Sequence, residues 1–230
     1  MGDNFTKEAY EGARAMIKNP DHKWMRYVNR LLDETDPHVA KMTALNLGYQ
    51  AAFYGTKTIR KMREVHDCNI PWLILMDPTS ACNLHCTGCW AAEYGHKLNL
   101  TFEELDSIVT QGKELGIYFY MMTGGEPLVR KADVIKLCEK HNDVAFHCYT
   151  NGTLVDQAFC DEMKRVGNLS LSISLEGFED TNDFRRGDGV YAKVLHAMDL
   201  LHENGLLFGN SVCYLSLIHI SEPTRQEAIS

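Results

Sequence analysis

The segment ACNLHCTGCWAAEYG, residues 81–95, holds three of the eight cysteines of this chain. Their spacing, Cys82-x3-Cys86-x2-Cys89, places three thiols on one short loop that has no fourth cysteine. A [4Fe–4S] cluster normally takes one thiolate at each of its four irons, so three cysteines hold three corners and leave the fourth iron open to a substrate or cofactor. We therefore predict that Cys82, Cys86 and Cys89 bind a [4Fe–4S] cluster.

Two other interpretations of this loop stay open, a zinc site and three unrelated thiols. Structural zinc prefers four protein ligands, usually from two paired C-x2-C knuckles, and the chain has no second knuckle. His85 would complete a Cys3His set, but it adjoins Cys86 in the same loop, which makes convergence on one ion awkward. The corresponding alternative function is a non-enzymatic module that binds zinc or transfers electrons through an iron–sulfur cluster.

Further polar motifs follow the cysteines at intervals along the chain. They are TGGEP (residues 123–127), TNGT (150–153) and SLEG (174–177). Gly124 and Gly125 have no side chains, so the backbone there can approach a ligand closely. An ordinary turn would also explain these glycines, but not the Glu126-Pro127 pair that follows them. Ser174 and Glu176 alternate onto one side of a strand end, where a hydroxyl and a carboxylate suit ribose; a solvated strand end is the alternative.

The elements that must position these motifs alternate between strands and helices from residue 71 onward. Apolar runs predict strands over residues 72–79, 117–122, 144–150, 169–175 and 206–214, and amphipathic segments predict helices over 101–116, 131–142, 154–167 and 189–205. Thr101 and Glu104 form the capping box of the first of these helices, which Gly116 ends. Alternating buried strands and helices predict an α/β fold built of parallel βαβ units, a partial (βα) TIM-type barrel that is truncated after about its fifth strand.

The cysteines and the three polar motifs each follow a predicted strand, one strand after another. The carboxyl ends of parallel strands form the rim where barrel folds build their active sites. We therefore expect four motifs that are separate in sequence to form one site.

Residues 1–67 predict an all-helical segment without a chemical motif. Helices are expected over residues 6–19 and 20–34, with Pro20 in a first turn, and over 36–66, with a break at Gly55. A helical cap packed on the catalytic part is the favoured interpretation, and a partner-binding module is the alternative.

Composition restricts the class of protein. The 230 residues are 45% hydrophobic and carry a formal net charge of −8 without a block of basic residues, which disfavours nucleic acid or an anionic membrane as a partner. No secretory signal is apparent, and runs such as WLILM fall far below the roughly 20 apolar residues of a transmembrane helix. We expect a cytoplasmic protein whose other cysteines are small buried hydrophobic residues rather than disulfides: Cys68, Cys138, Cys148, Cys160 and Cys213.

With the spacing Cys82-x3-Cys86-x2-Cys89 after a first strand and Gly124-Gly125-Glu126-Pro127 after a second, residues 71–214 resemble the radical S-adenosylmethionine (SAM) superfamily. The resemblance implies that the open iron is chelated by the amino and carboxylate groups of SAM. One electron from the cluster then cleaves SAM to methionine and a 5′-deoxyadenosyl radical, which abstracts hydrogen from a substrate or adds to it. It further implies an unidentified small-molecule, lipid or peptide substrate and an electron donor such as flavodoxin or ferredoxin.

The resemblance also assigns roles to the rim residues. Gly124, Gly125 and Glu126 would hold the SAM amino group, Ser174 and Glu176 the ribose, and Arg186 the SAM carboxylate, since a guanidinium pairs well with a carboxylate. Arg185 is an equally good surface charge. Thr150 and Asn151 would face the adenosyl group, although Asn-Gly is also common turn chemistry.

The sequence departs from the family at two places. Gly88 stands where an aromatic residue usually contacts the adenine, and Trp90 or Tyr94 is the hypothetical substitute. Residues 215–230 resemble the translated read-through of a sequencing adapter, so we expect a non-native tail there and a natural sequence that ends, in this chain, near Tyr214; a genuine extension is the alternative. The expected parts are therefore a helical segment (1–67), a radical SAM core (71–214) that lacks the usual later strands, and the tail (215–230).

Overall fold

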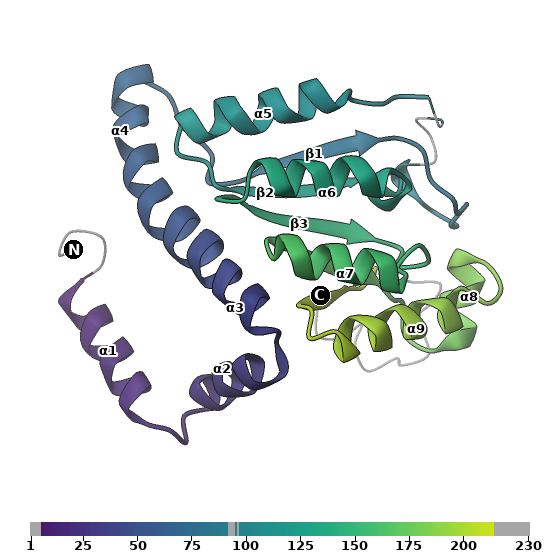
Figure 1. Ribbon diagram of the computed structural model, residues 1–230, viewed down its shortest axis with the longest axis horizontal. Helices are drawn as coiled ribbons and strands as arrows, with labels where there is room; N and C mark the ends of the chain where they lie inside the picture. Colours follow the sequence, from purple (N-terminus) through teal and green to yellow (C-terminus); the bar gives the residue numbers. More distant parts are fainter. Residues whose placement is uncertain (1–5, 92–94, 96, 214–230) are drawn as a thin grey trace, which may run out of the picture.

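The computed structural model describes residues 6–91, 95 and 97–213 (Figure 1). Within them, five parallel strands form one sheet in the order β1-β2-β3-β4-β5. They are β1 (Ile74–Thr79), β2 (Phe119–Gly124), β3 (Ala145–Thr150), β4 (Leu169–Ser174) and β5 (Phe208–Ser211). Because the spatial order follows the chain order, the sheet is wound in one direction, as in a (βα) barrel. The predicted α/β fold with a partial barrel is confirmed.

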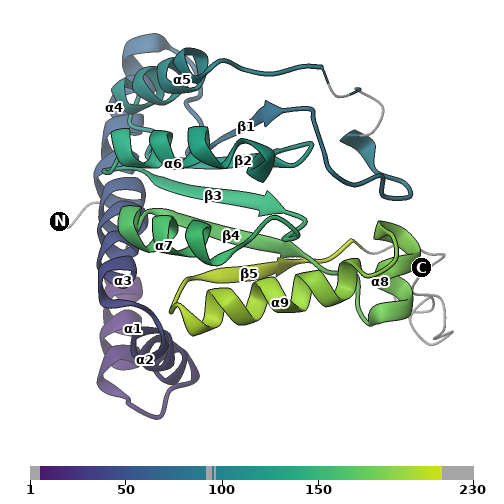
Figure 2. The same ribbon diagram turned by 45° about the vertical axis from the view of Figure 1, so that its right-hand side comes forward.

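The helices between the strands cover one face of this sheet (Figure 2). They are α5 (Phe102–Glu114), η3 (Pro127–Arg130), α6 (Lys131–Lys140), α7 (Gln157–Val166), α8 (Glu179–Arg186) and α9 (Val190–Glu203). The predicted capping box begins α5, with the Thr101 hydroxyl accepting from the Glu104 amide at 3.1 Å and the Glu104 carboxylate accepting from the Thr101 amide at 2.7 Å. Helix α8 was not predicted, because its eight residues, EDTNDFRR, contain a single apolar side chain and therefore no apolar face.

The strands alternate between a buried face and an open face. Tyr120, Phe146 and Leu171 are at most 1% exposed and pack under the helices, whereas their neighbours His147 and Ser172 on the other face are only partly buried. Burying the first set contributes about 1.5–3 kcal/mol for each large apolar side chain. The second set faces the inside of the partial barrel and leaves polar groups there.

Helices fill most of residues 7–66, with non-helical segments at 19–22 and 35–36, but some of the boundaries differ from the prediction. The elements are α1 (Lys7–Lys18), α2 (Lys23–Glu34), α3 (Pro37–Thr43), η1 (Ala44–Gly55), which is π-helical, and α4 (Thr56–His66). Pro20 lies outside α2, whose N-cap is His22, so its assignment to a first turn was wrong. The predicted break at Gly55 is also wrong: its backbone is helical, with φ −60°, and the run continues into α4.

The run from α3 to α4 crosses the end of the sheet where the strands begin (Figures 1 and 2). Asn46 donates its side-chain amide to the carbonyls of Asn142 (2.8 Å) and Val144 (3.3 Å), just before β3. A Cβ on Gly55 would lie 2.4 Å from the Gly116 carbonyl, so the close approach before β2 requires glycine there. The end of the sheet opposite the predicted rim is therefore closed by helix.

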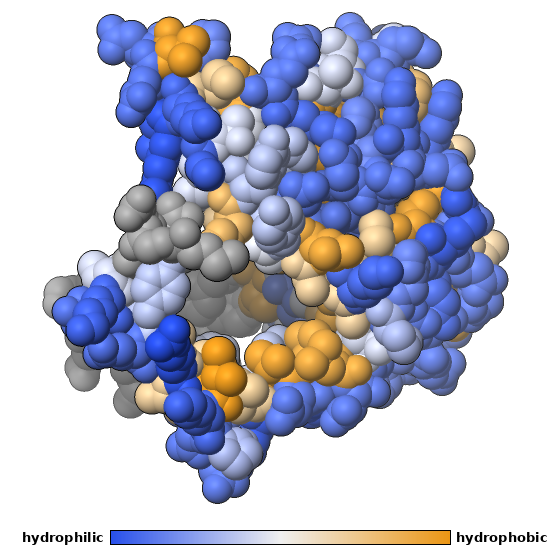
Figure 3. Space-filling view, turned by 60° about the vertical axis from the view of Figure 1, so that its left-hand side comes forward, coloured by the Kyte–Doolittle hydropathy of each residue, from blue (hydrophilic) through white to orange (hydrophobic). Residues whose placement is uncertain are grey.

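Helices α1 and α2 have a different character from this run. Neither contains a buried residue, and Trp24, Tyr27 and Leu32 of α2 are each at least half exposed. Figure 3 views the molecule from this side and displays apolar side chains on the surface.

Candidate functional site

A cavity of about 510 Å³ lies at the end of the sheet where the strands finish. All eleven residues predicted from the sequence line it: Cys82, Cys86, Cys89, Gly124, Gly125, Glu126, Thr150, Asn151, Ser174, Glu176 and Arg186. They come from the last residues of β2, β3 and β4, from the segments that follow β1 to β4, and from the end of α8. The fold therefore brings together motifs that are more than a hundred residues apart in the chain, as the rim argument requires.

The three cysteines have free thiols and are half-buried on the cavity wall. Burial raises the pKa of the Cys82 and Cys86 thiols, and the positive charge of Arg186 partly opposes this effect on the Cys86 pKa. They also border a small hollow of about 50 Å³ together with Leu84 and His85. Three soft thiolate donors on one wall, with a guanidinium beside one of them, suit a cluster of irons and sulfides.

The three cysteines line one small hollow, but the described residues form no ready-made site for a single metal ion there. Among the residues that the structure describes, no three His, Cys, Asp or Glu side chains are arranged to hold one metal ion. A tetrahedral zinc site needs such convergence, whereas a cubic cluster binds each thiolate at a different corner. Three cysteines without a fourth ligand among them fit the three corners of a cluster, and His85 is a further donor in the same loop.

The Gly124-Gly125-Glu126 segment is hydrogen-bonded to the start of the cysteine loop. The amides of Gly125 and Glu126 donate to the carbonyls of Thr79 (2.9 Å) and Ala81 (2.7 Å). A Cβ on Gly125 would lie 2.2 Å from the Ala81 carbonyl oxygen, and Gly124 has φ +108°. The two glycines are therefore required by the packing of the protein's own loops, a reason that the sequence pattern did not reveal.

Glu126 links the loops after β2 and β3. Its side chain is 1% exposed and accepts from the Thr150 hydroxyl (2.7 Å), the Asn151 amide (2.7 Å) and the Leu128 amide (2.9 Å). Burial raises the pKa of Glu126, and these three donors oppose that effect because they stabilise the carboxylate.

Asn151 extends this network to the cysteine loop. Its side-chain amide donates to the Asn83 side-chain oxygen (2.9 Å), and Asn83 in turn donates to the Thr153 hydroxyl (2.9 Å). The TNGT motif thus fixes the first turn of the cysteine loop, while its own turn is closed by the Thr153 amide donating to Asn151 (2.9 Å).

Glu176 is fully buried and paired with two arginines. Its carboxylate accepts from Arg185 Nη1 (2.7 Å), Arg186 Nη2 (2.8 Å) and Arg186 Nε. The interpretation of Arg185 as a surface charge was wrong, since it is 8% exposed. Burial lowers the pKa of Arg186, but its hydrogen bonds to Glu176 outweigh this, so the pKa is raised overall and the guanidinium stays charged.

The end of α8 also holds the cysteine loop. The Thr87 amide donates to the Arg185 carbonyl (2.8 Å), and Arg186 Nη1 lies 3.9 Å from the Cys86 sulfur. Counting the described residues only, these contacts and those to Glu176 use three of the five guanidinium N–H groups of Arg186, which leaves two for a ligand in the cavity. One buried carboxylate between two arginines leaves a net positive charge beside the thiols.

Ser174 lies at the end of β4, and Gly88 and Trp90 lie in or next to the cysteine loop. Ser174 lines the cavity beside Ser211 of β5, its partner in the sheet. Gly88 has φ +68°, which an aromatic residue rarely adopts, and Trp90 lines the cavity. Tyr94, Tyr214 and residues 215–230 lie outside the described residues, so the predictions made for them are unchanged.

The cysteines outside the loop divide into two groups. Cys138, Cys148 and Cys160 are buried as predicted, but Cys68 is exposed, and Cys213 is half-buried and lines the cavity. Sequence analysis also missed Tyr149 and Ser211, which line the cavity from β3 and β5. The alternation of β3 places Tyr149 on the open face with His147, a signal that the pattern of the strand contained.

Comparison with known proteins identifies this arrangement. Residues 76–227 match the family described as the Radical SAM superfamily. The chain belongs to the radical SAM superfamily. Fe-coproporphyrin III synthase of Methanosarcina barkeri is 29% identical over 142 residues, which cover 60% of this chain and 35% of that protein. GTP 3′,8-cyclase of Peptoclostridium acidaminophilum is 36% identical over 138 residues, covering 56% of this chain and 42% of that protein.

A radical SAM fold is also found among solved structures. Streptococcus suis SuiB bound to S-adenosylmethionine has a TM-score of 0.56 at 17% identity, covering 69% of this chain and 36% of that one. SuiB bound to its precursor peptide SuiA gives a TM-score of 0.59 at 18% identity over the same shares. This radical SAM chain spans less than half the length of these relatives. None of its described helices is both long and apolar enough to cross a membrane.

Proposed function

We propose that this protein is a radical SAM enzyme that holds a [4Fe–4S] cluster on Cys82, Cys86 and Cys89 and binds SAM in the 510 Å³ cavity. When bound, the reduced cluster supplies the electron that cleaves SAM to methionine and a 5′-deoxyadenosyl radical. The observation that carries the proposal is the meeting of all eleven predicted residues, from separate segments, around one cavity. The relatives that match the same region are a synthase and a cyclase.

The chain's own residues divide the binding of SAM among the strand ends. Arg186 pairs with the SAM carboxylate through its two remaining N–H groups, since charge-assisted guanidinium bonds are the strong ones. Gly124 and Gly125 present backbone carbonyls to the amino group, and the amide of Gly125 is already used by the Thr79 carbonyl.

The adenosyl part lies against the later strands in this proposal. Ser174 accepts a ribose hydroxyl. Glu176 is fully buried beneath its arginines, so we assign it to holding Arg186 in place rather than to the ribose. Thr150 and Asn151 form the wall on the adenosyl side, and both are held rigid by their bonds to Glu126. The loops are bonded to one another, so the cavity is preorganised before a ligand enters.

The protein acts on an unidentified small molecule, lipid or peptide, and a flavodoxin- or ferredoxin-type protein supplies the electron. SuiB, which shares the fold, was solved with a peptide. A cytoplasmic location suits the free state of all eight cysteines, because that compartment keeps thiols reduced.

A second candidate is a metal-binding or electron-transfer module without catalysis. His85 at the small hollow is the observation that favours it, since a histidine there adds a nitrogen donor to the three thiols. The meeting of the three cysteines with Gly124, Glu126, Ser174 and Arg186 around one cavity large enough for a bound cofactor favours the enzyme.

Anaerobic reconstitution with iron and sulfide distinguishes the two. The enzyme becomes brown and, with dithionite, converts SAM to 5′-deoxyadenosine, which is measured by chromatography. Cys86→Ser is the loss variant, and Cys68→Ser, at an exposed site outside the cavity, is its matched control. A colourless protein with tightly bound zinc, or a brown protein that leaves SAM intact, would refute the proposal.

A further inference from the structure

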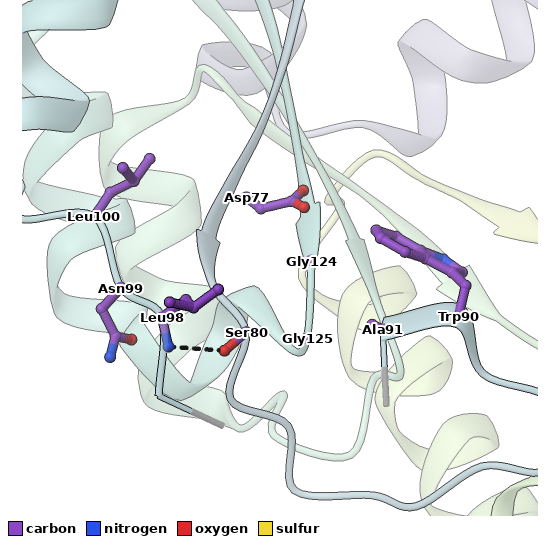
Figure 4. A pocket seen from close by; sticks show the side chains of 9 residues that line it. All are labelled: Asp77, Ser80, Trp90, Ala91, Leu98, Asn99, Leu100, Gly124 and Gly125. Carbon is purple, nitrogen blue, oxygen red and sulfur yellow. Dashed lines mark hydrogen bonds between the residues drawn. The ribbon is translucent and has the colours of Figure 1, made fainter. Parts of the chain in front are cut away.

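A second cavity of about 460 Å³ adjoins the proposed SAM site and shares Trp90, Gly124 and Gly125 with it (Figure 4). Its other lining residues are Asp77, Ser80, Ala91, Leu98, Asn99 and Leu100. The walls are therefore largely apolar, and a ligand in this space would lie directly beside the proposed place of radical formation.

The wall formed by residues 98–100 is fixed to the end of β1. Ser80 accepts the Leu98 amide on its hydroxyl (3.0 Å) and donates its own amide to the Leu98 carbonyl (2.8 Å). The Thr79 hydroxyl donates to the Asn99 side-chain oxygen (2.6 Å). Two of the cavity's polar side chains thus serve to build it, and Asp77 is left as its acidic group.

An irregularity in β1 determines where Asp77 points. Met76 pairs with Met122 and Thr79 with Gly124, so two residues of β1, Asp77 and Pro78, stand opposite one residue of β2. Such a bulge changes the direction of a side chain and is common beside active sites. In Figure 4 the Asp77 carboxylate extends toward the strand of Gly124.

The space that Asp77 occupies depends on the glycine opposite. A Cβ on Gly124 would lie 3.0 Å from Asp77 Cβ and 3.2 Å from its Cγ, which is closer than ordinary contact. The bulge in β1 and the missing side chain of Gly124 together leave room for the Asp77 carboxylate beside β2.

No hydrogen bond or ion pair to Asp77 is found among the described residues. Arg186 is paired with Glu176, and Arg130 is paired with Asp133 and donates to the carbonyls of Pro78 (2.7 Å) and Leu100. Asp77 is exposed, and partial burial of its carboxyl raises the pKa of that group. Asp77 is thus an exposed carboxylate without a protein partner in the described part of the chain, on the wall of a largely apolar cavity, and it offers a charge-assisted contact to a cationic ligand whose apolar part enters that cavity.

We propose that this cavity is the substrate subsite of the radical enzyme and that Asp77 binds an ammonium group carried on an apolar substrate body. The inference rests on the proposed function, because it places the substrate beside SAM. Leu98, Leu100 and the Trp90 ring accommodate the apolar body, and an indole face also attracts a cation.

The experiment uses n-hexylammonium as the probe, with 1-hexanol and hexanoate as neutral and anionic matches, titrated into the reconstituted protein and followed by ligand-observed NMR. The expected result is that hexylammonium binds about tenfold more tightly than hexanol, hexanoate binds most weakly, and Asp77→Asn removes the difference. Asp199→Asn, at an exposed aspartate of α9, is the matched control and retains the preference. Equal affinities, no detectable binding, or a preference that survives Asp77→Asn would overturn the proposal.

The titration is then repeated with saturating SAM, because SAM also carries an ammonium group that Asp77 could bind. Retained hexylammonium binding supports a substrate subsite, and complete competition assigns Asp77 to SAM and overturns it. The two proposals fail separately: SAM cleavage without a hexylammonium preference refutes the subsite alone, and the preference without SAM cleavage refutes the enzyme function.

Discussion

The two ends of the sheet are held by different kinds of contact. At the beginning of the strands, the run from α3 to α4 approaches so closely that Gly55 tolerates no Cβ against the Gly116 carbonyl. At the end of the strands, no helix crosses in the described part of the chain, and the loops are joined by buried polar groups such as Glu126 and Glu176. One end is closed by packing, and the other remains a cavity because hydrogen bonds between loops hold it open.

Helices α1 and α2 extend this comparison. They contain no buried residue, whereas the sheet and its helices contain almost the whole apolar core. We therefore expect changes at the rim to act on activity, changes in the sheet to act on stability, and changes on α2 to act on neither.

The largest effect is expected at the cysteine loop. Cys86→Ser removes one of three thiolates from the proposed cluster and should abolish 5′-deoxyadenosine formation, with a loss of at least about 1,000-fold, while urea unfolding changes little. Iron content and the visible spectrum report the cluster directly. Activity within about tenfold of the wild type would exclude Cys86 as a ligand.

The next effect contrasts two leucines. Leu171→Ala in β4, where the side chain is 0% exposed, should lower the free energy of unfolding by about 2–5 kcal/mol because it leaves a cavity. Leu32→Ala in α2, where the side chain is 56% exposed, should change it by at most about 0.5 kcal/mol. Urea titration measures both, and similar losses for the two would mean that α2 contributes to the core.

A smaller effect is expected for the carboxylate that links the loops. Both carboxylate oxygens of Glu126 accept hydrogen bonds, one from Leu128 and Thr150 and the other from Asn151. Glu126→Gln replaces one of these oxygens by an NH2 group, which then faces a backbone N–H donor. The variant should lose about 2 kcal/mol of stability and bind SAM more weakly. Glu139→Gln, at a 59% exposed carboxylate paired with Arg165, is the control and should lose less than about 1 kcal/mol.

The last prediction concerns the change in the free energy of unfolding with pH. Burial lowers the pKa of His147, whose ring nitrogens lie 2.8 and 2.9 Å from the Ser170 and Ser172 hydroxyls, and burial also lowers the pKa of His141. Below the ordinary histidine pKa the unfolded chain therefore binds more protons than the folded one, so stability falls as pH falls from about 7 to 5. The slope is at most about 1.4 kcal/mol per pH unit for each group.

His147→Gln should make this slope smaller without removing it, because His141 remains. Urea titrations at several pH values give the slope. An unchanged slope in the variant would show that His147 does not titrate with unfolding.

The cysteine loop and the positions of the polar motifs were predictable, because both depend on residues that are close together in the sequence. The spacing of Cys82, Cys86 and Cys89 is enough to indicate a cluster loop, and the placement of each motif after a strand predicts that the motifs meet. The capping box of Thr101 and Glu104 was likewise predictable, since both partners lie within one turn. Helix α8 and the burial of Arg185 were not, because a polar octapeptide carries no periodic signal and its burial comes from Glu176, a residue outside the helix.

The sequence by itself determined the five strands, most of the helices and the cysteine loop, because these depend on periodicity or on spacing within a short segment; the remaining rim residues, such as Arg186, followed from the resemblance of its motifs to the radical SAM superfamily. Only the tertiary structure decided that Gly124 and Gly125 serve the contact between two loops, that Arg185 and Arg186 share one carboxylate, and that the bulge at Asp77 opens toward a second cavity. These features depend on distances between segments that are far apart in the chain, and no local pattern records such distances.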